Sequence, residues 1–202
     1  MMQRENNPEE KAAQFLKNGL KDINEAIKGA QDIVAEMVNE DEQARNTVRF
    51  AFSRQAVITA KVVKGKESEA DKYRDYFEFS KPLKKCTSHQ LLAIRRAEAE
   101  GLLKVSISPD DEECVERLER RFVRSNNACG EQVAEAVQDA YKRLLKSSIE
   151  TEFAAQSKEQ ADEEAIRVFV QNLRQLLLAS PLGQKRVMGI DPGFRTGCKV
   201  VC

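Results

Sequence analysis

The chain has 202 residues, of which 33 are basic and 33 are acidic, so its formal net charge at pH 7 is zero. This balance excludes a general electrostatic attraction to nucleic acid, and any nucleic-acid site must be local. Hydrophobic residues make up 41% of the chain and charged residues 33%, which is typical of a folded, helix-rich protein of one or two domains.

Composition also argues against membranes, disulfides and bound metals. No apolar run approaches the ~20 residues that a membrane span needs, and the polar start MMQRENNPEE does not resemble a signal peptide. We therefore expect a cytoplasmic protein with no membrane partner. The five cysteines form no C-x-x-C pair and His89 is the single histidine, so we expect reduced thiols, no metal site and no cofactor.

The first third of the chain has mainly helical periodicity. In INEAIKGAQDIVAEMV (23–38), apolar residues recur every three or four positions, which predicts a helix with one apolar face that includes Ile33, Met37 and Val38. A second helix is predicted over 41–63, because its acidic start suits a helix N-terminus. The charged and aromatic segment 64–85 breaks this pattern and is interpreted as an extended arm or loop.

Further helices are predicted along the rest of the chain, with one short strand between them. TSHQLLAIRRAEAEG (87–101) begins with cap residues and ends at a glycine, and LLKVSI (102–107) has the composition of a strand. Apolar spacing then predicts helices over 108–125 and 129–145.

A long helix is predicted to follow, capped by Ser147 or Ser148. Its apolar stripe is interpreted as a face that packs into a core. The residues of the stripe are Ile166, Phe169, Val170, Leu173, Leu176 and Leu177.

The pattern changes to β at the end of the chain. RVMGID (186–191) reads as a strand that ends in Asp191, PGFRTG (192–197) as a turn, and CKVV (198–201) as a second strand. A carboxylate beside such a turn can hold a divalent metal, and the turn's backbone N–H groups and Thr196 can meet phosphate. RuvC-type and YqgF-type nucleases and actin-like ATPases use this arrangement on ribonuclease-H-like folds. The alternative interpretation is an ordinary β-hairpin that binds neither metal nor phosphate.

The expected fold class is mainly α, a multi-helix scaffold with a short strand near 102–107 and a C-terminal hairpin. Metal-assisted phosphoryl transfer needs several converging carboxylates, and the tail supplies only Asp191, so we expect no catalytic site. Local basic residues could contact phosphates, although each also has a plain interpretation as a capping residue or a solvated helix face beside acids. These candidates are Lys84, Lys85, His89, Arg95, Arg96, Arg195 and Lys199.

Four segments resemble one family. They are IKGAQDIVAEMVNED (27–41), KYRDYFEFSKPLKKCTSHQLLAIRRAEAEGLLKVSI (72–107), DAYKRLLKSSIETE (139–152) and FVQNLRQLLLASPLGQKRVMGIDPGFRTGCK (169–199). They are similar to the bacterial Tex proteins, the transcription accessory proteins, and the similarity extends along nearly the whole chain.

The resemblance implies a helical scaffold over residues 1–184 and the first strand and turn of a truncated YqgF-type RNase H-like domain over 185–202. It implies a non-enzymatic, architectural segment of a cytoplasmic factor that binds RNA, possibly DNA, through an OB-fold domain elsewhere and that acts with the transcription machinery. The alternatives are part of a YqgF-like or RuvC-like metal-dependent nuclease, an actin-like ATPase, and a scaffold that contacts only proteins.

Overall fold

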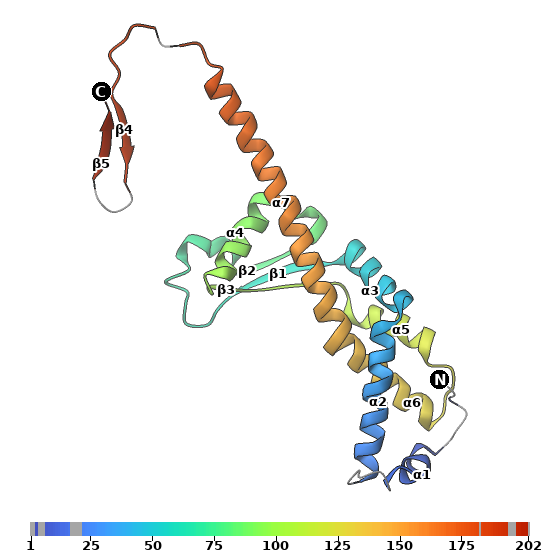
Figure 1. The fold of residues 1–202 in the computed structure, drawn as a ribbon. Helices are drawn as coiled ribbons and strands as arrows, with labels where there is room; N and C mark the ends of the chain where they lie inside the picture. Colours follow the sequence, from blue (N-terminus) through green and yellow to red (C-terminus); the bar gives the residue numbers. More distant parts are fainter. Residues whose placement is uncertain (1–2, 4–6, 17–21, 182, 194–196, 202) are drawn as a thin grey trace. The chain divides into compact units, whose positions relative to one another are not determined.

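The computed structural model describes residues 3, 7–16, 22–181, 183–193 and 197–201 (Figure 1). The fold is mainly α, as predicted from the sequence. The chain divides into two compact units, Met1–Ala165 and Ile166–Cys202, and each is described here by itself. None of the helices formed by the described residues is both long and apolar enough to span a bilayer.

The helices begin where short polar side chains cap them. Asp22, Asp41, Asp110 and Asn127 each accept a hydrogen bond from a backbone N–H of the first turn, which satisfies a donor that the helix leaves free. The α-helices are α1 Pro8–Ala13, α2 Ile23–Glu40, α3 Glu42–Gln55, α4 Ser88–Ala99, α5 Asp111–Phe122, α6 Ala128–Asp139 and α7 Lys146–Leu177. The described residues also include two 3₁₀ turns, η2 Asp71–Tyr76 and η3 Leu83–Lys85, and a π-helical segment, η4 Ala140–Leu145.

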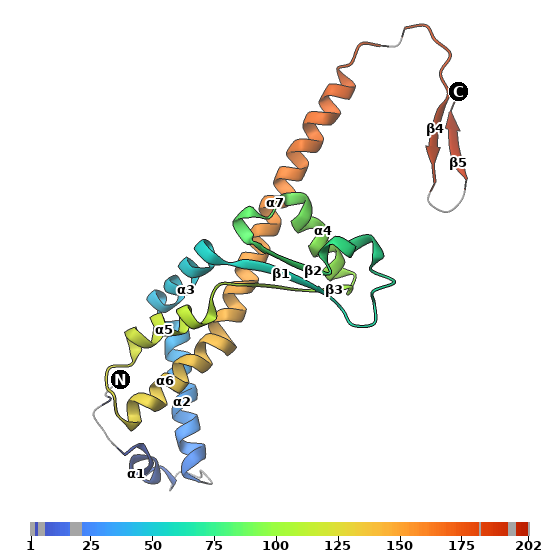
Figure 2. The ribbon, with the colours of Figure 1, turned by 180° about the vertical axis from the view of Figure 1, so that it is seen from behind.

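A three-stranded antiparallel sheet lies inside the first unit, in the order β2-β1-β3. Its strands are β1 Val57–Val62, β2 Glu78–Pro82 and β3 Leu103–Ser108, and Ile58 of β1 lies opposite both Lys81 and Ile107. The strand predicted at 102–107 is confirmed as β3. Figure 2 shows α4 beside this sheet, and α4 contacts β3.

The sheet corrects two sequence predictions. The helix predicted over 41–63 ends at Gln55, and its second half is β1, because β-branched residues at 57–59 and 62 fit a strand paired on both sides. The segment 64–85, interpreted as an extended arm, contains η2, β2 and η3.

Both outer edges of the sheet have a feature that limits pairing. Phe77 and Leu83 are hydrogen-bonded to the β1 segment, so the alternating geometry places Pro82, which has no N–H, on the outer edge of β2. On the outer edge of β3, the N–H of Ile107 donates to the Glu150 carboxylate of α7 at 2.6 Å.

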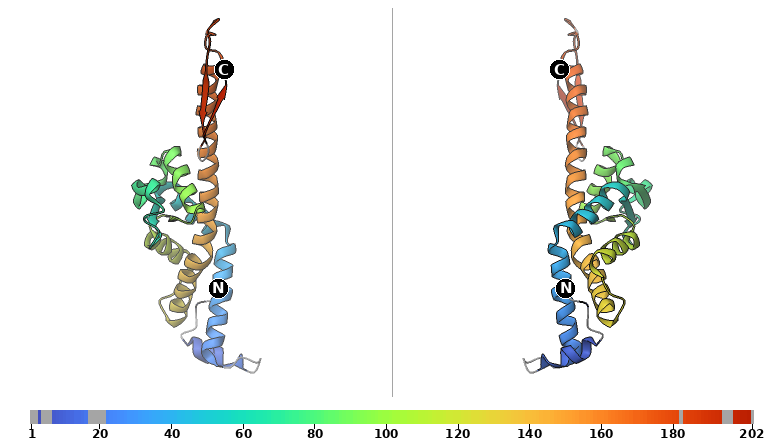
Figure 3. Two further views of the ribbon diagram at one scale, coloured as in Figure 1. Left: turned by 90° about the vertical axis from the view of Figure 1, so that its left-hand side faces the viewer. Right: turned by 90° about the vertical axis from the view of Figure 1, so that its right-hand side faces the viewer.

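The core of the first unit extends from α2 to Ala161. Figure 3 shows α2 and α6 side by side, and α5 packs against both α3 and α6. The rings of Phe52 and Phe153 lie 5.4 Å apart, centroid to centroid. The largest fully buried side chains are Val38, Val48, Phe52, Ile58, Ile94, Ile107, Leu118, Val137, Tyr141, Leu145 and Ile149.

The predicted break before the long helix is absent. Helical residues continue from Ala128 through η4 to Leu177, and Ser147 and Ser148 lie inside α7 rather than capping it. The Ser148 hydroxyl instead accepts a hydrogen bond from Arg45 at 3.0 Å. The predicted serine cap is therefore wrong.

The second unit contains the end of α7 and a hairpin. Strands β4 Gly189–Pro192 and β5 Cys198–Val201 pair antiparallel, with Ile190 opposite Val200, so both predicted strands are present, while residues 194–196 of the predicted turn between them lie outside the described residues. The prediction that the stripe on α7 packs into a core is wrong, because Ile166, Phe169 and Leu177 are 62%, 64% and 74% exposed. Ile190 and Val200 are exposed as well, so the described part of this unit contains no second apolar layer.

Candidate nucleic-acid interface

Three of the predicted contact residues lie together at the start of α4. Lys84 and Lys85 belong to η3, directly before the helix, and His89 lies in its first turn; all three are exposed. A capping box between Thr87 and Gln90 fixes the entry of the chain into the helix. Two ammonium groups and an imidazole therefore meet at the positive end of a helix dipole, an arrangement that favours an anionic partner.

Arg95 lies in a different environment. Its side chain is only 14% exposed, and its Nη1 donates to Glu98 at 2.7 Å. Its Nε and Nη2 are buried and have no acceptor among the residues that the structure describes. The guanidinium is therefore held inside the fold rather than presented to a phosphate, and the structure separates it from Lys84, Lys85 and His89.

Arg96 is exposed but lies among acids. The Lys72 ammonium, which donates to Glu100, lowers the pKa of that carboxyl, and the nearby charge of Arg96 contributes to the shift. Arg96 therefore faces a carboxylate that stays ionised, which reduces its attraction for a phosphate.

A polar hollow of about 440 Å³ lies beside η3 and is lined in part by Lys84. Its walls come from α3, η3, α4 and α7, and Ser88 donates its hydroxyl hydrogen to Glu164 inside it. The carboxylate makes the hollow better suited to a hydrogen-bond donor than to an anion. Burial raises the pKa of the Cys86 thiol in the same wall, so the reactive thiolate is disfavoured.

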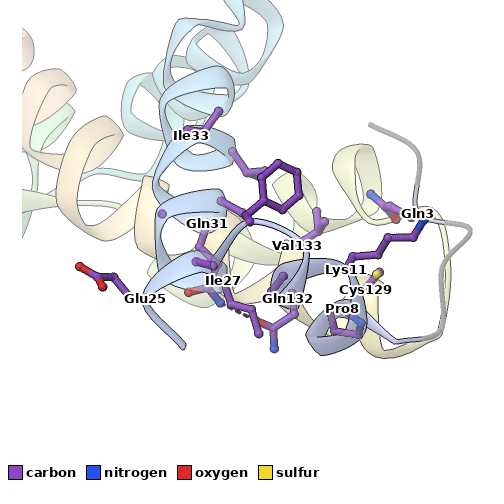
Figure 4. Close-up of a pocket in the computed structure, with 16 residues that line it drawn as sticks. Gln3, Pro8, Lys11, Glu25, Ile27, Gln31, Ile33, Cys129, Gln132 and Val133 are labelled. Atoms are coloured by element: carbon purple, nitrogen blue, oxygen red, sulfur yellow. Dashed lines mark hydrogen bonds between the residues drawn. The ribbon is translucent and has the colours of Figure 1, made fainter. Parts of the chain in front are cut away.

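A second hollow, of about 660 Å³, lies between α1, α2 and α6 (Figure 4). Its lining is mostly apolar and includes Ile27, Ile33 and Val133, while Gln31 donates to Gln132 at 2.9 Å across the α2–α6 contact. Neither hollow could be predicted from the sequence, because each joins helices that are distant in the chain and no local motif marks it.

The hairpin places Asp191 opposite Lys199 on neighbouring strands, a cross-strand position of opposite charges. Asp191 is exposed, and the described residues form no cluster of three or more possible metal ligands. Arg195 and Thr196 lie outside the described residues.

A partly buried polar network, which was not predicted from the sequence, joins β3, α5, η4 and α7. Tyr141 donates to Asp111 Oδ1 at 2.6 Å, Ser108 donates to the same oxygen at 2.9 Å, and Lys146 pairs with the other oxygen. Burial would raise the pKa of Asp111, but these three donors outweigh it and lower the pKa below its ordinary value. Burial and the adjacent carboxylate raise the pKa of Tyr141, so its hydroxyl remains a donor.

Sequence comparisons identify relatives along most of the chain. The family described as Tex central region-like matches residues 3–169. Protein YhgF of Escherichia coli is 37% identical over 205 residues, which cover 96% of this chain and 26% of that protein. The transcriptional accessory protein Tex of Neisseria gonorrhoeae is 36% identical over 199 residues, covering 94% and 26%.

A human relative, S1 RNA-binding domain-containing protein 1, is 33% identical over 195 residues, covering 90% of this chain and 20% of that protein. The chain therefore spans about a quarter of the length of its bacterial relatives and about a fifth of the human one. Because one family match covers most of its length, this chain belongs to the Tex family, whose central region it contains.

Proposed function

We propose that this chain is the architectural segment of a Tex-like transcription accessory factor that binds nucleic acid, RNA foremost. The proposal is supported by the names of two relatives, a transcriptional accessory protein and an S1 RNA-binding domain-containing protein. The role of the first unit is to hold other domains at fixed positions. The role of the hairpin, from about residue 185 onward, is to begin a YqgF-type RNase H-like domain.

The observation that carries the architectural role is how the first unit ties distant segments together. Gln3 donates to the carbonyl of Phe122 and accepts from the N–H of Arg124, both at 2.6 Å. Arg49 of α3 pairs with Glu152 of α7 at 3.0 Å, and β1 lies between strands that follow it in the chain. Long-range ties of this kind make a segment move as one body, which is what a scaffold requires.

The hairpin is assigned to the beginning of a larger sheet because of its exposed apolar residues. Ile190, Val200 and Val201 are 59%, 56% and 71% exposed. A two-stranded hairpin is marginally stable in water, and more strands or a packed helix normally complete it.

We expect the chain alone to bind single-stranded RNA weakly, with a dissociation constant on the order of 10⁻⁴–10⁻⁶ M at physiological salt. Fluorescence anisotropy with a labelled oligonucleotide measures it. Because Lys84 and Lys85 are the exposed cations at the start of α4, the double variant K84Q/K85Q should weaken binding and reduce the salt slope by about two. The control K142Q, an exposed lysine on η4, should change neither quantity.

Sub-micromolar binding that is lost on changing Arg95 and Arg96 would contradict this assignment. Such a result would mean that the first unit itself makes the main contact with nucleic acid and is not only a scaffold.

We also expect the chain to cleave neither RNA nor branched DNA with Mg²⁺ or Mn²⁺. Asp191 stands opposite Lys199, and two-metal hydrolysis needs further carboxylates at the same point. Nuclease assays on the chain and on Asp191→Asn should both show no turnover. Cleavage by the unmodified chain that disappears in Asp191→Asn would favour the nuclease alternative.

A further inference from the structure

The polar hollow beside η3 has the make-up of a small-molecule pocket. Its volume of about 440 Å³ falls within the range of ~300–1,000 Å³ that such pockets occupy. Phe52 and Leu91 give it a buried apolar lining, together with the half-buried ring of Phe153. Polar side chains of η3, α4 and α7 form the rest of its wall, and all of them belong to the first unit. A few convergent polar groups beside an apolar lining are what hold and orient a small ligand.

Glu164 decides which chemical groups the hollow accepts. Its two oxygens offer about four lone-pair sites, and the hydroxyl of Ser88 uses one of them, on Oε2. The remaining sites favour a ligand that presents hydrogen-bond donors, and two donors side by side would engage both oxygens. Gln160 lies one helical turn earlier on α7 and lines the same hollow, so its amide can donate to a carbonyl next to those donors.

The basic residues around the hollow argue against a cationic ligand. Lys84 lines it from η3, and Lys85 and His89 are exposed beside Lys84 at the start of α4. An arginine or lysine side chain of a partner protein would suit Glu164, but the two ammonium groups would repel it. A ligand with a donor edge at one end and a phosphate at the other satisfies both the carboxylate and the lysines.

We propose that this hollow binds a guanine base, presented as an unpaired nucleotide of single-stranded RNA, an inference that deepens the proposed binding of RNA and rests on it. The Watson–Crick edge of guanine carries two adjacent donors, N1–H and the N2 amino group, which pair with the two oxygens of Glu164, while its O6 accepts from Gln160. The other bases place an acceptor next to the donor on that edge, and a carboxylate repels an acceptor. The base packs against Phe153, and Lys84 and Lys85 contact the phosphates.

NMR of the full chain with the monophosphates of guanosine, adenosine, cytidine and uridine tests the base preference. We expect guanosine monophosphate to shift the amide resonances of Ser88, Gln160 and Glu164 and to bind at least about fivefold more tightly than each of the others. Arginine amide is the competing probe and should bind more weakly than guanosine monophosphate. Tighter binding of arginine amide at the same resonances would overturn the proposal in favour of a basic partner protein.

Exchanging the carboxylate for an amide should change the preferred base. Glu164→Gln replaces one acceptor with a donor, so the affinity for guanosine monophosphate should fall about tenfold. Adenosine monophosphate should become the preferred nucleotide, because a glutamine amide matches the adjacent donor and acceptor of adenine. The matched control Glu163→Gln removes the same charge from an exposed neighbour outside the lining of the hollow, and it should leave both affinities unchanged. A loss of guanosine binding without a gain for adenosine, or an equal effect of the control, would overturn the proposal.

Fluorescence anisotropy with short oligouridylates, with and without one central guanosine, separates this inference from the proposed function. We expect the guanosine to tighten binding about tenfold, and Glu164→Gln to remove that gain. Equal binding of both oligonucleotides, weakened alike by K84Q/K85Q, would overturn the guanine site and leave the proposed binding of RNA standing. Guanosine monophosphate binding with the expected Glu164→Gln switch, but without binding of either oligonucleotide, would support the guanine site and contradict the proposed function.

Discussion

Replacing Tyr141 with alanine should lower the free energy of unfolding by about 3–5 kcal/mol, the usual cost of removing a large buried ring. Tyr141 is 0% exposed and is one of the largest fully buried side chains of the first unit. Its loss leaves a cavity where η4 and the core meet and removes the donor to Asp111. Urea unfolding followed by circular dichroism measures the change.

The variant Tyr141→Phe separates packing from hydrogen bonding at the same position. It keeps the ring but removes the hydroxyl, so we expect the free energy of unfolding to fall by only about 1–2 kcal/mol. The loss should lie near the lower value, because the Asp111 side chain is 47% exposed and water can replace the lost hydrogen bond. Equal losses for the phenylalanine and alanine variants would mean that the polar network, rather than the packed ring, stabilises this region.

Two helical glycines should respond to alanine in opposite directions. A Cβ built on Gly130 would lie 2.0 Å from the backbone oxygen of Ser125, so Gly130→Ala must displace the turn before α6. We expect it to lower the free energy of unfolding by about 2–3 kcal/mol. Gly29 in α2 has nothing within 4 Å of its Cβ position, so Gly29→Ala should raise stability by about 1 kcal/mol through helix propensity.

The pair of glycine variants serves as its own control in one denaturation series. Because the chemical change is identical, the difference between them reports only the space around each Cβ. The N–H of Gly130 donates to the side chain of Asn127 at 2.9 Å, which indicates a tightly held turn before α6. A neutral effect of Gly130→Ala would contradict this and would show that the turn can move away from the added methyl group.

Local chemistry was enough to predict several elements. The cap residues before α4 and the glycine after it gave both ends of that helix, and Gly101 has the left-handed φ of +70° that only glycine adopts readily. The acidic first turn of α5 and the β-branched and apolar run of β3 were also read correctly. In each case the information lies within a few residues of the element itself.

Elements that depend on distant partners were not predictable in this way. The β1 segment follows α3 without a helix breaker, and its two pairing strands come about twenty and forty-five residues later. On α2, the apolar pattern placed Ile33, Met37 and Val38 on one face, yet Ile33 and Met37 are 62% and 51% exposed while Val38 is fully buried. Periodicity gives a helix its apolar face but does not say which neighbour covers that face.

The candidate site shows the same limit. Residue type alone marked Lys84, Lys85, His89, Arg95 and Arg96 alike, and of these the structure places Lys84, Lys85 and His89 exposed around the start of α4. Nothing in the sequence indicated that Arg95, six residues further along α4, is held against Glu98, or that residues of α7 complete the hollow beside η3.

The two blocked edges of the β2-β1-β3 sheet have a consequence for aggregation. An open strand edge can template the addition of further strands from other molecules. Here Pro82 offers no N–H on one edge, and on the other the N–H of Ile107 is already bonded to Glu150 of α7. The second protection is conditional, because it lasts only while the first turns of α7 remain docked. Local opening of that helix, rather than unfolding of the sheet, is therefore the event that would expose β3 as a template for fibrillar growth.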